Sequence, residues 1–318
     1  MKIKAFMALS LAVVLLAPGC KKDESTTTLP SLTGLGMNTV TPFVREGTTL
    51  EFKADIESIT ATSTSTGTTV TQPDAIGLYW QVNGSGQRDT LTRDIKKSNP
   101  VYRYTADTLG TYNVYCYAYA SGYYNASAYI TFKAIDPLTV LTGLKTEGAV
   151  SFDGKIHRTV VIGEKAWLAE NLYTEGGRLY GNAEVLESVF GRYYTWEEAL
   201  TACPDGWHLP TDAEFNTLGL DARDLMAEAT FDKEKMWEYW PGMDPTNELG
   251  FNAIPCGYMD LAQPSSELGY LEYAAWWTAD EYDDLRATFR YIYEDNPLLE
   301  KDKGSKTSLA LNVRCVLD

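Results

Sequence analysis

The stretch YYTWEEALTACPDGWHLPTDAEFNTL, residues 193–218, decides the fold of the C-terminal half of the chain. Thr195 lies three residues before Glu198, and Thr211 lies three residues before Glu214. Each pair has the spacing of a capping box, in which the hydroxyl and the carboxylate bond the exposed amides at the start of a helix. The stretch therefore predicts two short helices in quick succession.

The first of these helices is expected to bury a cysteine. Trp196, Ala199, Leu200 and Cys203 are spaced at i, i+3, i+4 and i+7, which places them on one helical face. Pro204 has no amide hydrogen and restricts the residue before it, so the helix should end there. A turn and a short extended segment, which contains His208, then lead into the second helix.

The first residues of the chain have the pattern of an export signal. Lys2 and Lys4 precede an apolar run that is too short to span a bilayer. The run ends in Leu-Ala-Pro-Gly-Cys, residues 16–20, which resembles the lipobox of bacterial lipoproteins. The resemblance implies a signal peptide over residues 1–19, a diacylated Cys20, and a Ser- and Thr-rich tether over residues 20–32. An ordinary signal peptide with a chance cysteine is the alternative.

The segment after this cysteine bears on location. Lys21-Lys22-Asp23-Glu24 resembles the acidic export tag of surface lipoproteins in the Bacteroidetes. Together the two resemblances imply a protein that is lipid-anchored in the outer membrane and exposed at the cell surface. Without residues 1–19 the chain keeps 25 basic and 43 acidic side chains, a net charge of −18. It should repel nucleic acid and anionic headgroups, so the expected membrane contact is the lipid anchor and nucleic acid is not an expected partner.

Residues 33–135 are expected to form an all-β domain. Apolar and polar residues alternate over residues 49–56, and short strands follow one another with Gly, Asn and Ser between them. One turn is expected at Asn83-Gly84. This pattern is typical of a small β-sandwich.

Two aromatic residues give this domain a family resemblance. Trp80 on a middle strand and Tyr112 at the end of the run DTLGTY resemble the core tryptophan and corner tyrosine of an immunoglobulin-like or PKD-like domain. The disulfide of the immunoglobulin pattern has no match, because Ala54 stands where a partner for Cys116 would lie. Cys116 is therefore expected to be a buried free thiol.

Next to a lipid anchor, such a domain is expected to act as a spacer. The alternative is a binding face on its tyrosine-rich strands, although aromatic residues are also good sheet formers. The tyrosines concerned are Tyr115, Tyr117, Tyr119, Tyr123 and Tyr124. Residues 58–71 are mostly Ser and Thr, which predicts an exposed loop or edge.

Five motifs over residues 145–318 together resemble one family. They are SFDGKIHRTVVIGEKAWLAENL at 151–172, the stretch quoted first, TNELGFNAIP at 246–255, WWT at 276–278 and VRCV at 313–316. In this order they are similar to the Fibrobacter succinogenes major paralogous domain, which is also common in lipoproteins of the Bacteroidetes. One departure is Cys256, where that family more often has a small residue without sulfur.

The same residues resemble the C-type lectin-like fold, in which the first helix is bonded to the last strand. The resemblance implies an α+β domain and a disulfide between Cys203 and Cys315, which the expected compartment permits. The chain as a whole is then multidomain, with an immunoglobulin- or PKD-like sandwich followed by a C-type lectin-like domain. The sugar-binding calcium loops of that fold are not matched, because Gln263-Pro264-Ser265 has no aspartate and Asn312 has no acid after it.

Candidate metal-binding and catalytic residues are few. Asp280, Glu281, Asp283 and Asp284 are dense enough for calcium, but a run of charges is more often a solvated surface. The chain has only two histidines, and the spacing of His208 within its turn favours a structural role. No nucleophile with a base and no pair of carboxylates stands out. We therefore expect no enzymatic activity and no cofactor.

Aromatic residues are the better indication of a binding site, since sugar faces stack on exposed rings. The four candidate ligand-binding residues are Trp237, Tyr239 and Trp240, before a Pro-Gly loop, and Tyr282. Trp276 and Trp277 are instead expected in the core. The expected function is a lectin-like module that binds a glycan without catalysis. The alternative is an adhesin or structural surface component that binds a host surface protein.

Overall fold

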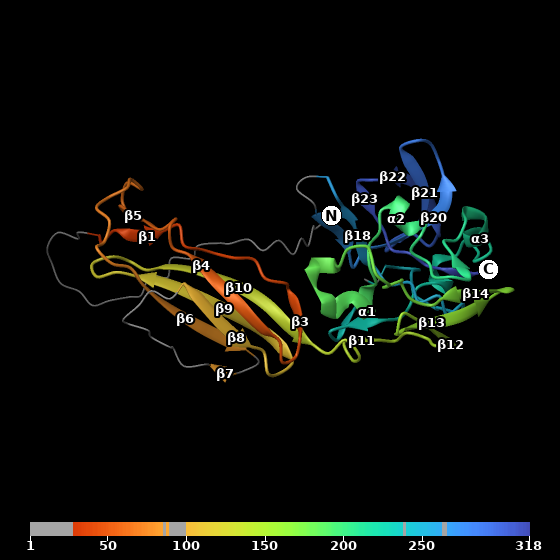
Figure 1. Ribbon diagram of the computed structural model, residues 1–318, viewed down its shortest axis with the longest axis horizontal. Helices are drawn as coiled ribbons and strands as arrows, with labels where there is room; N and C mark the ends of the chain where they lie inside the picture. The colour runs from red at the N-terminus through yellow and green to blue at the C-terminus, as the bar shows by residue number, and fades with distance from the viewer. Residues whose placement is uncertain (1–27, 85–86, 89–99, 238–239, 263–265) are drawn as a thin grey trace. The chain divides into compact units, whose positions relative to one another are not determined.

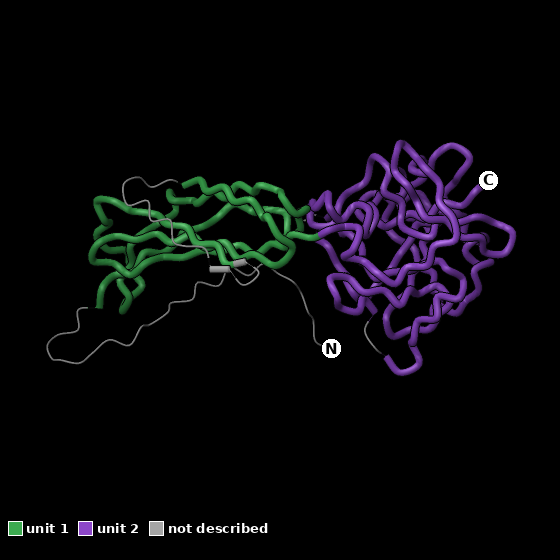
Figure 2. Tube along the Cα trace, turned by 90° about the horizontal axis from the view of Figure 1, so that it is seen from below, with its two compact units in different colours: residues 1–135 green, residues 136–318 purple. Residues whose placement is uncertain are grey.

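The computed structural model describes residues 28–84, 87–88, 100–237, 240–262 and 266–318. The chain divides into two compact units, residues 1–135 and 136–318 (Figure 2). Strands far outnumber helices in the described residues, which form several separate sheets (Figure 1). These residues include no helix with the length and apolarity needed to cross a lipid bilayer. Cys20 and the predicted signal peptide lie outside the described residues.

The described part of the N-terminal unit is built from three sheets. The largest has the order β3-β10-β9-β6-β7, from Phe43–Arg45, Ala126–Ile135, Gly110–Tyr119, Gly77–Gly84 and Gln87–Arg88. A second sheet, β2-β4-β8, is formed by Gly36–Met37, Thr49–Asp55 and Val101–Thr105. The third pairs β1 (Ser31–Thr33) with β5 (Thr60–Thr62), the latter from the Ser- and Thr-rich segment.

The core of this unit lies between the two larger sheets. Alternate residues of β9 point inward and are buried: Tyr112, Val114, Cys116 and Ala118. Trp80 on β6 stacks on Tyr102 of β8 with ring centroids 5.4 Å apart, and Phe52 on β4 lies 6.0 Å from Phe132 on β10. These aromatic pairs join the two sheets face to face.

The structure bears on three local predictions for this unit: the corner tyrosine, one turn and the free thiol. The hydroxyl of Tyr112 donates to the backbone carbonyl of Thr108 at 2.7 Å, the contact that a corner tyrosine makes. The turn expected at Asn83-Gly84 is wrong. These residues remain in β6, where they pair with Arg88 and Gln87 of β7. Cys116 is buried without a disulfide partner among the described residues, and burial raises the pKa of its thiol to about 12.

The C-terminal unit contains three further sheets. The first, β12-β13-β14-β24-β15, consists of Gly148–Phe152, Lys155–Ile162, Lys165–Leu168, Val316–Leu317 and Trp207–His208. The second, β19-β18-β20-β21-β22, consists of Ser266–Tyr270, Cys256–Asp260, Tyr273–Glu281, Arg286–Tyr293 and Glu300–Ser305, with β23 (Leu309–Ala310) paired to β18. The third, β11-β16-β17, consists of Leu141–Thr142, Thr230–Phe231 and Glu234–Lys235. Because β11 pairs within this unit, the unit includes residues before the predicted start at 145.

The helices of this unit are short. They are α1 (Glu187–Phe190), α2 (Trp196–Ala199) and α3 (Asp212–Asn216), with 3-10 turns η1 (Tyr180–Asn182), η2 (Glu184–Leu186) and η3 (Ala222–Asp224). Both predicted capping boxes are present, at the starts of α2 and α3. The helix predicted to reach Cys203 is wrong in length, since α2 ends at Ala199 and Leu200 is exposed.

A disulfide joins the segment after α2 to the segment before β24. Cys203 is bonded to Cys315, which confirms the predicted pairing. Cys203 is half-buried and Cys315 is fully buried. The bond therefore fixes the Pro204–Gly206 turn region to the interior.

Strand β20 lies between two hydrophobic clusters of this unit. Trp276 packs with Trp167, Phe251 and others, whereas its neighbour Trp277 packs with Tyr194, Phe289 and others. Successive side chains of a strand point to opposite faces, so the two tryptophans fill different clusters. Both are fully buried, which confirms the core assignment made from the sequence.

Candidate functional site

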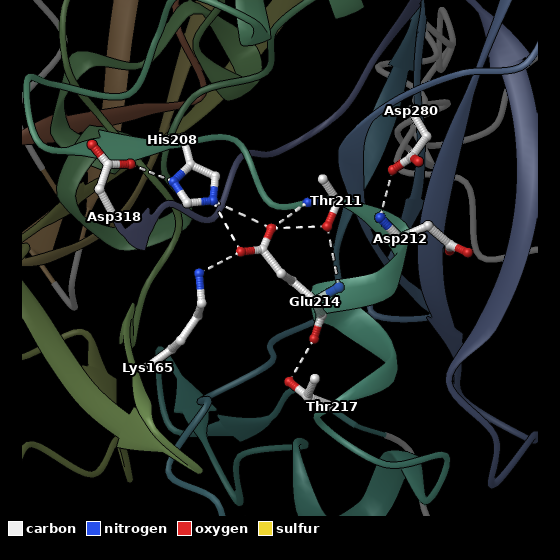
Figure 3. Close-up of polar contacts among 8 residues, drawn as sticks. All are labelled: Lys165, His208, Thr211, Asp212, Glu214, Thr217, Asp280 and Asp318. Atoms are coloured by element: carbon white, nitrogen blue, oxygen red, sulfur yellow. Dashed lines mark hydrogen bonds and ion pairs between the residues drawn. The ribbon is translucent and has the colours of Figure 1, made fainter.

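Polar side chains gather around Glu214 at the start of α3 (Figure 3). Its Oε1 accepts a hydrogen bond from Nζ of Lys165 at 2.7 Å, and its Oε2 accepts from the amide of Thr211 at 2.8 Å. Nε2 of His208 lies 3.0 Å from Oε1. Partial burial acts to raise the pKa of Glu214, but these bonds outweigh it and lower the pKa to about 2.

The other ring nitrogen of His208 is also engaged. Nδ1 lies 2.5 Å from Oδ1 of Asp318 (Figure 3). The amide of Asp318 donates to the carbonyl of Gly206. Since both ring nitrogens and both oxygens of Glu214 have partners, the cluster joins β15, β24 and α3 and leaves none of these atoms uncommitted for acid–base chemistry. This geometry favours the structural role expected for His208.

The acidic run near residue 280 is also bound to protein groups. Asp280 accepts from the amide of Asp212 at 2.5 Å, Glu281 pairs with Lys306, and Asp283 accepts both the Nε and the Nη2 bonds of Arg286. Within the described residues, no group of three His, Cys, Asp or Glu side chains could hold a metal ion.

The segments compared with the calcium loops of C-type lectins fall into two cases. Gln263-Pro264-Ser265 lies outside the described residues. The amide of Asn312 is buried and donates to the carbonyls of Phe190 and Arg192 at 3.2 and 3.0 Å. Asn312 is therefore committed to the interior of the unit.

The structure shows that one of the four candidate ligand-binding residues, Trp237, is buried, whereas Trp240 and Tyr282 are exposed. Trp237 is only 4% exposed, and its Nε1 donates to the carbonyl of Ala253 at 3.1 Å. It belongs to the core and cannot offer a ring face to a ligand. Trp240 is 40% exposed, and Tyr239 lies outside the described residues.

Tyr282 is 54% exposed, but cations already approach its ring. Nζ of Lys303 lies 4.3 Å from the ring centroid and donates to the hydroxyl at 3.1 Å. The guanidinium carbon of Arg286 lies 5.0 Å from the same centroid. A sugar could stack on this ring only where these cations leave it uncovered.

A cavity of about 580 Å³ provides a different candidate site, at η1 and at β18 and β19. The described residues that line it are polar and apolar: Arg178, Asn182, Ser266 and Glu267, with Leu179, Met259 and Leu261. Its volume lies in the range of small-molecule sites, and its lining combines hydrogen-bonding groups with apolar surface.

Hydrogen bonds hold this cavity in shape. Oε1 of Glu267 accepts from the amide of Gly181 at 2.6 Å, which connects β19 to η1. Arg178 pairs its backbone with Tyr193 and its guanidinium with the carboxylate of Glu198 at 2.7 Å. Asn182 has a φ of 51°, a left-handed conformation that asparagine adopts more readily than most residues.

The carboxyl of Glu267 is the titratable group most suited to contact a ligand here. The residue as a whole is exposed, but its carboxyl tips towards the 178–182 turn, and the desolvation raises its pKa. Among the described residues, its Oε2 has no hydrogen-bond partner. Glu267 can therefore accept a hydrogen bond from a ligand hydroxyl, or donate one to it when the carboxyl is protonated.

Sequence reasoning did not find this cavity. Arg178 and Glu267 belong to no motif, and the turn at Gly176-Gly177 is the only local signal near either of them. Their proximity depends on the contact between η1 and β19, which joins segments distant in sequence.

Comparison with known families places the site in context. A family model described as the Fibrobacter succinogenes major domain matches residues 160–317. The matched residues include the disulfide, both capping boxes and all the cavity-lining residues. No curated protein shows a significant match to the chain.

Proposed function

Residues 160–317 belong to the Fibrobacter succinogenes major domain family, and from this premise we propose that the chain is a surface lipoprotein whose C-terminal unit binds a glycan without catalysis. Its N-terminal unit is an immunoglobulin- or PKD-like spacer, and its C-terminal unit is C-type lectin-like. Cys20 carries the lipid that anchors both units to the outer membrane. Nucleic acid is not a partner.

The cavity lined by Arg178 and Glu267 is the observation that carries the glycan proposal. A sugar presents hydroxyls at its edge and C–H groups on its faces. The cavity offers guanidinium, amide, hydroxyl and carboxyl groups beside the apolar side chains of Leu179, Met259 and Leu261. Such a lining can bond the hydroxyls and cover the C–H faces of one or two sugar rings.

Two arrangements of the C-terminal unit support the lectin-like assignment. A disulfide ties the segment after the first capped helix to the segment before the last strand. The Trp207–His208 strand pairs with that same last strand. The first is the arrangement that the resemblance to the C-type lectin-like fold implies, and the second brings the segment between the two capped helices to the same last strand.

A glycan array probed with the soluble chain from Ser25 tests this proposal. We expect binding to a restricted set of glycans, reduced at least tenfold by Glu267→Gln and by Asn182→Gly. Glu267→Gln keeps an oxygen for the Gly181 amide, and Asn182→Gly suits the left-handed backbone, so both variants should fold. Glu197→Gln, at an exposed glutamate of α2 that is not among the described cavity-lining residues, is the matched control and should bind normally.

Two results would count against the proposal. If both cavity variants bind glycans as strongly as the unchanged chain, the cavity is not the glycan-binding site. Binding to host matrix proteins, with no glycan bound at all, would favour the adhesin alternative.

A further inference from the structure

The N-terminal unit carries a row of tyrosines on the outer face of its largest sheet. The side chains of β6, β9 and β10 alternate, and the buried set faces the second sheet. The outward set includes five tyrosines, which we call the tyrosine face: Tyr79, Tyr115, Tyr117, Tyr119 and Tyr129. Register places Tyr129 opposite Tyr115 and Tyr79 opposite Tyr117.

The rings of the tyrosine face form one continuous group. Tyr79 and Tyr117 stack with centroids 4.6 Å apart and planes 12° apart. Tyr115 lies 6.1 Å from Tyr117 and 5.5 Å from Tyr129, and Tyr119 lies 5.9 Å from Tyr79. Tyr129 is 47% exposed and the other four are half-buried. The group therefore spans three strands of the outer face.

Gly77 allows one of these rings to lie flat on the sheet. A Cβ added to Gly77 would lie 2.3 Å from Cζ, 2.5 Å from Oη and 2.6 Å from Cε1 of Tyr119. These distances place that position above the ring plane, because an approach in the plane would come closer to Oη than to Cζ. One face of the Tyr119 ring thus covers the glycine, and the opposite face points away from the sheet.

The face carries almost no charge. The other outward side chains of β6, β9 and β10 are Asn, Gln, Ser and Thr, with Lys133 and the buried Ile135 at the end of β10, where Arg45 of β3 lies opposite Ile135. No aspartate or glutamate occupies an outward position of these three strands, although the chain has 43 acidic residues. Two of the polar pairs bond each other, Gln81 to Asn83 at 3.0 Å and Thr131 to Asn113 at 2.7 Å.

We propose that the tyrosine face is a second binding site, for a neutral polysaccharide chain. Phenol hydroxyls and amides can bond sugar hydroxyls, and a flat ring such as Tyr119 can stack on the C–H face of a sugar. An open face across three strands suits an extended polymer better than an enclosed small molecule. The absence of carboxylates and the restriction of the described cations to Lys133 and Arg45, at the β3–β10 edge of the sheet, favour a neutral polymer, because the rings themselves offer no counter-charge.

Binding to neutral polysaccharides tests the proposal in the soluble chain from Ser25. The probes are a mixed-linkage β-glucan, a xylan and a galactomannan, with polygalacturonate as the anionic comparison, measured by affinity electrophoresis and calorimetry. We expect at least one neutral polymer to bind and polygalacturonate not to bind. Tyr117→Ser with Tyr129→Ser should weaken binding at least tenfold.

A glycine substitution gives the sharpest variant, because it alters no side chain that a ligand would touch. Gly77→Ala must displace the end of the Tyr119 ring, and it should weaken binding severalfold. Gly36→Ala on β2 is its matched control, since an added Cβ there comes no closer than 3.6 Å to another atom. Tyr124→Ser, at an exposed tyrosine of the same unit without a ring contact to the group, is the control for the double variant. Both controls should bind as the unchanged chain does, and thermal unfolding should show that the N-terminal unit of every variant is folded at the temperature of the binding assay.

Four outcomes would overturn the proposal. They are no binding to any neutral polymer, binding to polygalacturonate alone, unchanged binding by the Tyr117 and Tyr129 double variant, and self-association that this variant abolishes. The last would identify a second copy of the chain as the occupant. The proposal is separable from the cavity site, because Glu267→Gln should leave polysaccharide binding by the tyrosine face intact.

Discussion

Nδ1 of His157 lies 3.6 Å from Oε1 of Glu170 in the interior of the C-terminal unit, beyond hydrogen-bonding distance. Neither ring nitrogen has a hydrogen-bond partner within the described residues. The ring packs against aromatic neighbours instead, 4.0 Å from Tyr173 and 5.3 Å from Phe152 between centroids. Burial, reinforced by the charge of Lys155, lowers the pKa of His157 to about 4.

We expect the C-terminal unit to lose stability as the pH falls from about 6.5 towards 4. In that window the unfolded chain binds a proton at His157 and the folded chain does not, so acid favours unfolding by up to about 3 kcal/mol. His157→Phe should remove this part of the pH dependence, and urea unfolding at pH 7.5 and 4.5 measures it. Burial raises the pKa of Glu170, which acts in the opposite direction but equally in both proteins. The same pH dependence in both proteins would contradict the prediction.

Loss of the disulfide should destabilise the C-terminal unit strongly. Cys203 and Cys315 are 112 residues apart, and closing a loop of that length contributes about 4–5 kcal/mol on the chain-entropy estimate. The double variant Cys203→Ala, Cys315→Ala should therefore unfold at much lower urea concentration than the oxidised chain. Reducing agent should lower the urea concentration at which the unchanged chain unfolds, and it should not change that concentration for the double variant. Peptide mapping without reductant that finds both thiols free would refute the bond.

Truncation of two tryptophans three residues apart should reduce the free energy of unfolding by very different amounts. Trp237→Ala opens a cavity in the core and breaks the bond to the Ala253 carbonyl, so it should cost about 3–5 kcal/mol of unfolding free energy. Trp240→Ala, at a ring that is 40% exposed, should change stability by less than about 1 kcal/mol. Chemical denaturation of the two variants checks this, and equal losses would show that Trp237 is not a core residue.

Glu214 should stabilise the unit more than a glutamate at an equivalent helix start. Glu214→Ala removes a capping-box bond and the contacts to Lys165 and His208, and we expect a loss of about 1–2 kcal/mol. Glu197→Ala, at an exposed position in the first turn of α2, is the control. It should reduce the free energy of unfolding by only about 0.3 kcal/mol. Because the pKa of Glu214 is about 2, its contribution should be lost as the pH falls from about 4.5 to 2. If the difference in unfolding free energy between Glu214→Ala and the unchanged chain stays the same over this pH range, the ion pairs are not the source of the stabilisation.

The lipid anchor can be tested in cells. Labelled palmitate should be incorporated into the chain and not into Cys20→Ala, which should leave the membrane fraction. Protease added to intact cells should degrade the unchanged chain if it is exposed at the surface. Incorporation of label by Cys20→Ala would contradict the lipobox assignment.

The sequence was most informative where one short segment determines the outcome. The capping boxes depend on four consecutive residues each, so Thr195 with Glu198 and Thr211 with Glu214 could be identified without tertiary contacts. The exposure of Leu200 could not be predicted, because helical spacing does not reveal that α2 ends at Ala199, one residue before Leu200.

Burial and cavity geometry depend on distant contacts. Nothing in the run MWEYWPG distinguishes Trp237 from Trp240, since the partner of Trp237 is a carbonyl sixteen residues away. The proximity of Arg178 and Glu267 depends likewise on how a turn meets a sheet edge. The disulfide was anticipated through family resemblance, which carries tertiary information that spacing alone does not.

The adjacent tryptophans of β20 have a consequence for how the C-terminal unit unfolds. Trp276 and Trp277 belong to different hydrophobic clusters but lie on the same strand. If either cluster opens, β20 loses packing contacts that also hold it against the other cluster. The unit should therefore melt in a single cooperative transition. Shifting the register of this strand by one residue would exchange the two rings between clusters built for different neighbours, so insertions here should be tolerated far less than insertions in the surrounding loops.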